Sequence, residues 1–126
     1  MGAGAWGTTL ARLLCEANHT VTLWGHDADH LQDLARTGVN ERYLPGIRLP
    51  PGLGFAAELS GTLNGAECVI VAVPSKAFRE VTQALVSCEA ILVSVTKGIE
   101  YESGLTMCGV LKATAPVARE NFMTTV

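Results

Sequence analysis

The sequence predicts an α/β fold built on a parallel sheet, and three observations support this prediction. A glycine-rich turn with the spacing G-x-G-x-x-G opens the chain at residues 2–7. Helix-like and strand-like patterns then alternate along the chain, as is typical of βαβ units. Two of the expected strands, at 68–73 and 90–95, are almost entirely apolar, as parallel strands are when helices cover both faces.

The composition is that of one globular domain. The 126 residues are 48% hydrophobic and 17% charged, which is enough apolar content for a core and argues against disorder. The formal net charge of -3 argues against a nucleic-acid partner, because no basic stripe is present to neutralise phosphates. We expect no membrane span, because no apolar run approaches the roughly 20 residues that a span needs. We also expect no secretory signal, because the pattern of a charged n-region and an apolar h-region is absent.

Each glycine of the opening turn has its own physical task. Gly2 allows a tight turn out of a strand, and Gly4 lets the backbone approach a pyrophosphate closely. Gly7 lets the following helix pack closely on the sheet. The start of that helix presents unsatisfied N–H groups to an anion. On the motif alone, an ordinary flexible loop remains the alternative.

In the first half of the chain, end signals define the expected elements. Asn18 supplies a left-handed helix cap, Asp27 an N-cap, and Gly38 a helix stop. The second helix is expected to bury a stripe formed by Leu31, Leu34 and Ala35. The predicted elements are a helix over 5–17, a strand over 20–24, a helix over 27–36, a loop over 38–52 and a strand over 53–57.

In the second half, the strand over 68–73 ends at Pro74, and Ser75 is expected to cap the next helix. The loop 96–98 follows the second apolar strand. The predicted elements are a short helix over 58–63, a strand over 68–73, a helix over 76–86, a strand over 90–95 and a helix over 103–113.

The cysteines and histidines indicate no metal centre. The four cysteines contain no C-x-x-C pair and lie in apolar or helical contexts, which suits free thiols in a reducing cytoplasm. Counting alone leaves a disulfide or zinc framework open. The three histidines have no metal-ligand spacing with the cysteines, so we expect no metal.

Several segments, taken in order and spacing, resemble the N-terminal domain of the bacterial form of NAD(P)-dependent glycerol-3-phosphate dehydrogenases. They are the glycine turn with its tryptophan, V-T-L-W-G at 21–25, Y-L-P-G-I at 43–47, A-V-P-S at 72–75 and T-K-G-I-E at 96–100. The resemblance runs to about Pro116. It implies an incomplete dinucleotide-binding domain at 1–116 and leaves an unaligned tail at 117–126. The implied fold is a Rossmann-type, doubly wound parallel sheet.

The resemblance also implies a reaction. The family transfers a hydride between the nicotinamide of NAD or NADP and the oxygen-bearing carbon of dihydroxyacetone phosphate or glycerol 3-phosphate. The cofactor supplies the hydride chemistry, and the protein supplies binding and orientation. The expected partner is a small phosphorylated three-carbon substrate used in making phospholipid precursors, and a homodimer is compatible with the family.

The family's cofactor contacts map onto matching positions of this chain. Ala5 and Trp6 would meet the pyrophosphate and ribose, although Trp6 can also be interpreted as a packing aromatic. Lys97 would bind both the substrate and the nicotinamide end, the alternative being a surface lysine without function. The full set of implied cofactor contacts is Gly2, Gly4, Ala5, Trp6, Gly7, His26, Pro74, Ser75 and Lys97.

The choice between NAD and NADP stays open. An acidic residue after the second strand of such a fold binds the ribose 2′-hydroxyl, whereas an arginine suits a 2′-phosphate. The family often carries an arginine at this place. Here Gly25 and His26 come first and Asp27 follows, so His26 departs from the family pattern. His26 can meet ribose or phosphate, or simply be solvated.

Both ends of the chain depart from the family pattern. Only Met1 precedes the glycine turn, so the first strand, central in a sheet of order 3-2-1-4-5, is missing. Each lost ladder bond costs on the order of 1 kcal/mol, so we expect the isolated chain to be marginally stable or to borrow a strand. At the other end, no residue matches the helical domain that holds the family's proton-transferring lysine. No catalytic residue is therefore assigned.

Three functions fit these residues. The leading one is the cofactor-binding domain of a glycerol-3-phosphate dehydrogenase, an oxidoreductase, inactive as this fragment. The second is a stand-alone nucleotide-binding or regulatory module without redox activity. The third is another dehydrogenase acting on a β-hydroxy acid or ketopantoate, against which the segments 43–46 and 96–98 count.

Overall fold

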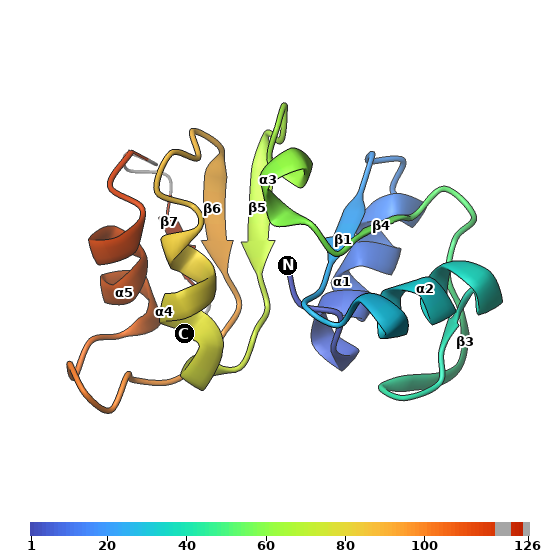
Figure 1. The fold of residues 1–126 in the computed structure, drawn as a ribbon, viewed down its shortest axis with the longest axis horizontal. Coiled ribbons are helices and arrows are strands. Elements are labelled where there is room, and N and C mark those ends of the chain that lie inside the picture. Colours follow the sequence, from blue (N-terminus) through green and yellow to red (C-terminus); the bar gives the residue numbers. More distant parts are fainter. Residues whose placement is uncertain (118–121, 125–126) are drawn as a thin grey trace. The chain divides into compact units, whose positions relative to one another are not determined.

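The computed structural model describes residues 1–117 and 122–124, which form two compact units. The first unit is Met1–Thr62, and the second begins at Leu63 (Figure 1). Both are α/β units with parallel strands, which confirms the predicted fold class. No helix in the described part of the chain is both long and apolar enough to cross a membrane.

The first unit contains one parallel and one antiparallel strand pair. β1 and β4 are parallel with Leu23 opposite Phe55, and β2 and β3 form an antiparallel hairpin. The core of this unit comes from Ala11, Leu23, Leu31, Leu34, Leu49 and Leu53. Its elements are α1 (Ala5–Glu16), β1 (Thr22–Trp24), α2 (Ala28–Thr37), β2 (Val39–Asn40), β3 (Leu44–Arg48), β4 (Gly54–Ala56) and α3 (Leu59–Thr62).

The end signals of the first two helices work as predicted. Asn18 follows α1 with a φ of 66°, in the left-handed region. The Asp27 side chain accepts a hydrogen bond from the His30 amide at 3.0 Å and so caps α2. Gly38 ends α2 in the left-handed conformation. The buried stripe of α2 was only partly right, because Ala35 is exposed while both leucines are buried.

The prediction of a loop over 38–52 was wrong, because this segment contains the β2–β3 hairpin. Val39 pairs with Arg48, Asn40 pairs with Leu44, and the Leu49 amide bonds the Gly38 carbonyl at 2.8 Å. Proline and glycine in the segment hid the strand pattern. The proline is tolerated here because a residue on an edge strand need not donate a hydrogen bond to a neighbouring strand.

The second unit is a parallel sheet in the order β5-β6-β7. Val71 lies opposite Ser94, and α4 and α5 pack on each other. β7 was not expected from the sequence. The elements are β5 (Cys68–Val71), α4 (Ser75–Gln83), β6 (Ile91–Ser94), α5 (Met107–Thr114) and β7 (Phe122–Thr124).

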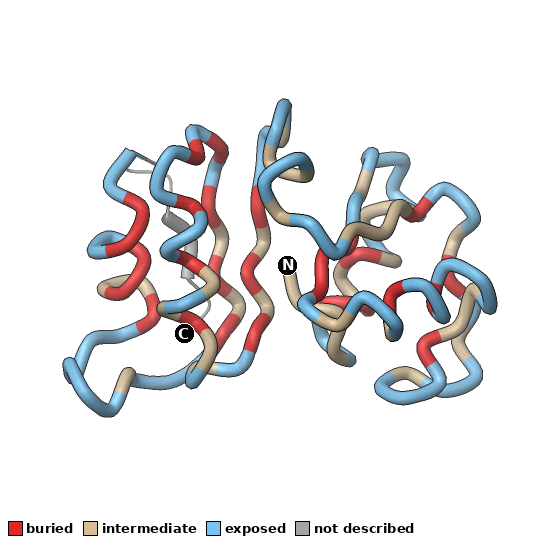
Figure 2. Tube along the Cα trace, viewed as in Figure 1, coloured by how far each residue is buried: buried red, intermediate tan, exposed pale blue. Residues whose placement is uncertain are grey.

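The apolar strands β5 and β6 are buried at alternate positions. Val69, Val71 and Leu92 are buried, whereas Cys68 and Ile91 are exposed (Figure 2). One face of this sheet is therefore well covered in the described residues, and the expected equal cover of both faces is not seen. The strand pairings agree with the predicted order, in which β1 neighbours β4 and β5 neighbours β6.

Candidate functional site

The glycine turn is built as a phosphate-binding turn requires. Gly2 has a φ of 102°, which favours glycine, and its amide donates to the Trp24 carbonyl at the end of β1 at 2.8 Å. Gly4 is the N-cap of α1, and no side chain caps this helix. The first helical bond runs from the Thr8 amide to the Gly4 carbonyl at 3.0 Å. The amides before Thr8 therefore have no acceptor within the helix, as an anion site needs.

The space in front of this helix start is open. A Cβ built on Gly4 meets no atom within 4 Å, so no neighbouring atom fills the space on that side of the helix start. Gly7 is buried at the base of α1, while Ala5 is exposed at its first position. Trp6 is 58% exposed, which makes its ring available for contact and argues against a core role. These features fit a pyrophosphate.

Asn40 holds the glycine turn against the hairpin. This fully buried residue donates from Nδ2 to the Ala3 carbonyl at 3.1 Å and to Thr8 Oγ1 at 2.8 Å. Its Oδ1 accepts from the Tyr43 amide at 3.2 Å. The sequence analysis missed this role, because Asn40 lay in a segment assigned as loop. The only signal is a lone amide side chain just before the Y-L-P-G segment.

The end of β1 lies directly beside the glycine turn. A Cβ on Gly25 would come within 3.1 Å of the Ala3 Cβ, an unusually tight contact that favours glycine here. His26 follows and is exposed. The His30 amide donates a hydrogen bond to the Asp27 carboxylate, and this bond is the main cause of the lowered pKa of Asp27. Asp27 is thus ionised at neutral pH at the point where dinucleotide-binding folds meet the adenosine ribose.

In the second unit, two strand ends meet. Pro74 and Ser75 follow β5, and Lys97 and Gly98 follow β6. Gly98 has a φ of 124°, and a Cβ built on it would lie 3.7 Å from the Ser75 Cβ. Thr96 Oγ1 donates to the Val73 carbonyl at 2.7 Å and ties the two ends together. Ligands of open α/β sheets bind at such carboxyl ends.

Ser75 does not cap α4, contrary to the prediction. Pro74 holds the N-cap position with extended backbone, so Ser75 is already the first helical residue. No side chain caps this helix start, and Ser75 Oγ lies 3.8 Å from the position that a Cβ on Gly98 would take. The hydroxyl is therefore placed at the strand ends.

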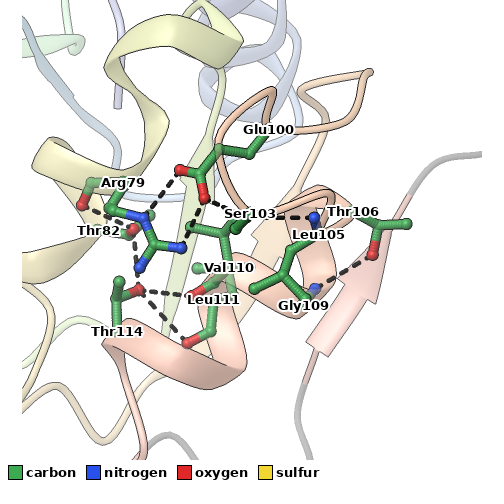
Figure 3. A network of polar contacts seen from close by, with 10 residues as sticks. All are labelled: Arg79, Thr82, Glu100, Ser103, Leu105, Thr106, Gly109, Val110, Leu111 and Thr114. Carbon is green, nitrogen blue, oxygen red and sulfur yellow. Dashed lines mark hydrogen bonds and ion pairs between the residues drawn. The ribbon is translucent and has the colours of Figure 1, made fainter.

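Lys97 is exposed, and no hydrogen bond or ion pair involves it within residues 1–117. The loop that carries it is nevertheless fixed, because Arg79 of α4 binds Glu100 three residues further on (Figure 3). Glu100 also accepts from the Ser103 hydroxyl. A free ammonium group on a fixed loop can attract a phosphate or a polarised oxygen.

The predicted site residues thus form two groups. Those of the glycine turn and His26 come together in the first unit, and those of the strand ends come together in the second. The described residues contain no cluster of histidine, cysteine and carboxylate side chains arranged to hold a metal ion. Both groups are chemically suited to polar, phosphate-bearing ligands.

Comparison with known proteins identifies the same family over nearly the whole chain. Residues 1–124 match the family described as the NAD-dependent glycerol-3-phosphate dehydrogenase N-terminus. A glycerol-3-phosphate dehydrogenase (NAD(P)+) of Anaeromyxobacter dehalogenans is 45% identical over 126 residues, which is 98% of this chain and 38% of that protein. One from Geobacillus thermodenitrificans is 44% identical over 103 residues, 79% of this chain and 30% of that protein.

Solved structures agree with this assignment. The crystal structure of glycerol-3-phosphate dehydrogenase from Coxiella burnetii matches with a TM-score of 0.83 at 32% identity, covering 94% of this chain and 36% of that chain. The structure of the Dunaliella salina protein matches with a TM-score of 0.78 at 19% identity, which shows the fold alone. This chain therefore spans well under half the length of these relatives.

Proposed function

Because this chain belongs to the family of the NAD-dependent glycerol-3-phosphate dehydrogenase N-terminus, we propose that it binds NAD or NADP as the nucleotide-binding part of such a dehydrogenase. The observation that carries the proposal is the uncapped start of α1 behind the open volume at Gly4. That start offers amide donors and the positive end of a helix dipole to a pyrophosphate.

Each group of residues has a part in this proposal. The amides of Ala5, Trp6 and Gly7 bind the pyrophosphate, with Gly2 shaping the turn and Gly4 keeping the space open. The exposed Trp6 ring contacts the ribose, and His26 contacts the adenosine end. When bound, the dinucleotide supplies the hydride, and these residues hold and orient it.

The strand ends of the second unit serve the reacting end. Pro74 and Ser75 contact the nicotinamide half, and Lys97 contacts both the nicotinamide end and the substrate. The support for this is the exposed ammonium of Lys97, which has no partner within residues 1–117, on a loop that the Arg79–Glu100 ion pair fixes. A cation there attracts the phosphate or the carbonyl oxygen of a three-carbon substrate.

For the whole protein we propose hydride transfer between the nicotinamide and dihydroxyacetone phosphate or glycerol 3-phosphate. The domain boundary proposed from the sequence, 1–116, lies before β7, which adds a strand from within 117–126. A cytoplasmic location, a place in phospholipid precursor synthesis and a homodimer are parts of the same proposal. The support for them is the kind of enzyme that the family name describes.

Fluorescence titration with NADH and NADPH tests the binding proposal directly. Binding with a Kd in the micromolar to millimolar range supports it, and no binding of either nucleotide in that range overturns it. Joining the chain to the remaining length of the Anaeromyxobacter dehalogenans relative then tests the reaction. Reduction of dihydroxyacetone phosphate by this chimera supports a dehydrogenase, whereas nucleotide binding without turnover supports a stand-alone nucleotide-binding module.

A further inference from the structure

Arg42 lies far from β1 in the sequence, and the β2–β3 hairpin brings it to the end of β1. It lies in the turn between β2 and β3, which Asn40 fastens to the glycine turn through Ala3 and Thr8. From this turn its Nη1 atom reaches to 3.6 Å from Asp27 Oδ2. An arginine and a carboxylate therefore face each other where the adenosine ribose of a dinucleotide binds.

Aromatic contacts set the direction of the Arg42 guanidinium. Its Cζ atom lies 5.0 Å from the centroid of the Tyr43 ring. His30 packs edge-on against the same ring, with centroids 5.5 Å apart and an interplanar angle of 88°. The guanidinium thus rests on a ring face, which leaves its N–H donors available at the edge.

The ion pair between Arg42 and Asp27 is weak and can separate at little cost in free energy. The side chains are 61% and 42% exposed, and the single 3.6 Å approach is longer than a hydrogen bond. Exposed pairs of this kind contribute little to stability, so separating them costs little. Asp27 Oδ1 already accepts from the His30 amide, so Oδ2 is the carboxylate oxygen without a hydrogen bond in the described part of the chain.

We propose that Arg42 and Asp27 select between the two forms of the dinucleotide, Arg42 binding the 2′-phosphate of NADP(H) and Asp27 the 2′-hydroxyl of NAD(H). This inference rests on the proposed nucleotide-binding function and names its specificity residues. A carboxylate accepts a hydrogen bond from a hydroxyl but repels a phosphate, whereas the planar fork of arginine matches phosphate oxygens. His26 is exposed next to Asp27.

The chain can therefore bind either nucleotide, NAD(H) through Asp27 and NADP(H) through Arg42. With NAD(H) the ion pair stays closed and Asp27 Oδ2 accepts from the ribose. With NADP(H) the guanidinium turns from Oδ2 to the phosphate, and the carboxylate remains as a repulsive neighbour. Removing the arginine should harm NADP(H) binding selectively, and neutralising the carboxylate should favour it.

The test measures Kd values for NADH and NADPH by fluorescence titration of the unmodified chain and of Arg42→Gln and Asp27→Asn. Calorimetry with ADP-ribose and 2′-phospho-ADP-ribose repeats the comparison without any nicotinamide, so it is independent of activity. Arg42→Gln should weaken NADPH at least about tenfold and NADH less than about twofold, since one charge-assisted contact is lost. Asp27→Asn should tighten NADPH and weaken NADH, and it keeps the α2 cap because asparagine caps as well as aspartate.

Arg48→Gln is the matched control. Arg48 is an exposed arginine of the same hairpin, at the far end of β3, so its loss should change neither Kd. Circular dichroism and an unchanged Tm show that each variant is folded. If the unmodified chain binds neither nucleotide, the proposed function fails. If it binds NADH alone, or if Arg42→Gln weakens the binding of both nucleotides equally or of neither, the proposed role of Arg42 and Asp27 in selecting the nucleotide is wrong. The proposed nucleotide binding then still stands.

Discussion

Arg79 and Glu100 meet in a two-point ion pair, with Nε 2.8 Å from Oε1 and Nη2 2.6 Å from Oε2. The pair joins α4 to the loop after β6, and the Glu100 side chain is only 15% exposed (Figure 3). Hydrogen bonds from Arg79 and then Ser103 lower the pKa of Glu100 to about 2. This arrangement ties the loop of Lys97 to the helix and makes its anchoring depend on pH.

The first prediction concerns the free energy of unfolding at acid pH. The pKa of Glu100 is about 2 in the folded chain, below the ordinary value of 4.5. The stabilisation from Glu100 is therefore complete above about pH 4.5 and is lost as the pH falls through about 2. Glu100→Gln should be less stable than the parent at pH 7, and the difference should shrink between pH 4.5 and 2.

Urea denaturation at several pH values between 2.5 and 7 measures this difference. Glu89→Gln is the control, because Glu89 is exposed and has no ion pair in the described part of the chain. It should leave the pH dependence unchanged. A gap between Glu100→Gln and the parent that stays constant over this pH range would contradict the prediction.

The second prediction separates folding from binding at Gly4. Its backbone is extended, with a φ of -77°, and its Cβ position is open, so Gly4→Ala and Gly4→Asp should fold normally. Aspartate should even stabilise α1 by a few tenths of a kcal/mol, as an N-cap residue. Both variants should weaken NADH binding at least about tenfold, the aspartate more, because it places a negative charge where the phosphates bind.

Thermal unfolding and fluorescence titration of the same samples check this pair of outcomes. Gly61→Ala is the matched control, since its Cβ position is also open but it belongs to α3 and not to the glycine turn. Unchanged nucleotide affinity in both Gly4 variants would show that the phosphates bind elsewhere.

Local signals predicted much of the fold. Caps at Asn18, Asp27 and Gly38 lie where the sequence placed them, because each depends on chemistry within one turn of the chain. The parallel strands β5 and β6 were found from their apolar runs. β7 was missed because three residues at 122–124 carry no periodic pattern, and their pairing with β6 comes from tertiary structure.

The site was predicted less completely than the fold. The glycine turn and Lys97 have motif spacing, so the sequence pointed to them. Asn40 and Arg42 have none, since their roles depend on a hairpin that brings Asn40 to Thr8, 32 positions earlier, and Arg42 to Asp27. Such long-range contacts leave no periodic trace in a single sequence.

The third prediction concerns Asn40. Asn40→Ala leaves the Ala3 carbonyl and the Thr8 hydroxyl without their buried partner, so it should destabilise the chain by about 2–3 kcal/mol. Nucleotide affinity should fall as well, because the glycine turn loses its support. Chemical denaturation and NADH titration measure the two effects, and Asn64→Ala, an exposed turn residue, is the control. An Asn40→Ala variant as stable as its parent would refute the anchoring role.

The last prediction separates substrate binding from nucleotide binding at Lys97. Because Lys97 is exposed and has no partner within residues 1–117, Lys97→Ala should leave Tm unchanged. In the chimera with the Anaeromyxobacter dehalogenans relative, it should raise KM for dihydroxyacetone phosphate at least about tenfold, through the lost charge-assisted contact. The Kd for NADH should change by less than about threefold, since the glycine turn supplies most of that binding.

The control is Lys112→Ala, which removes an exposed lysine on α5 and should alter neither KM nor Kd. Equal fold increases in KM and Kd would assign Lys97 to the nucleotide alone. No increase in either would show that Lys97 is a surface lysine without function.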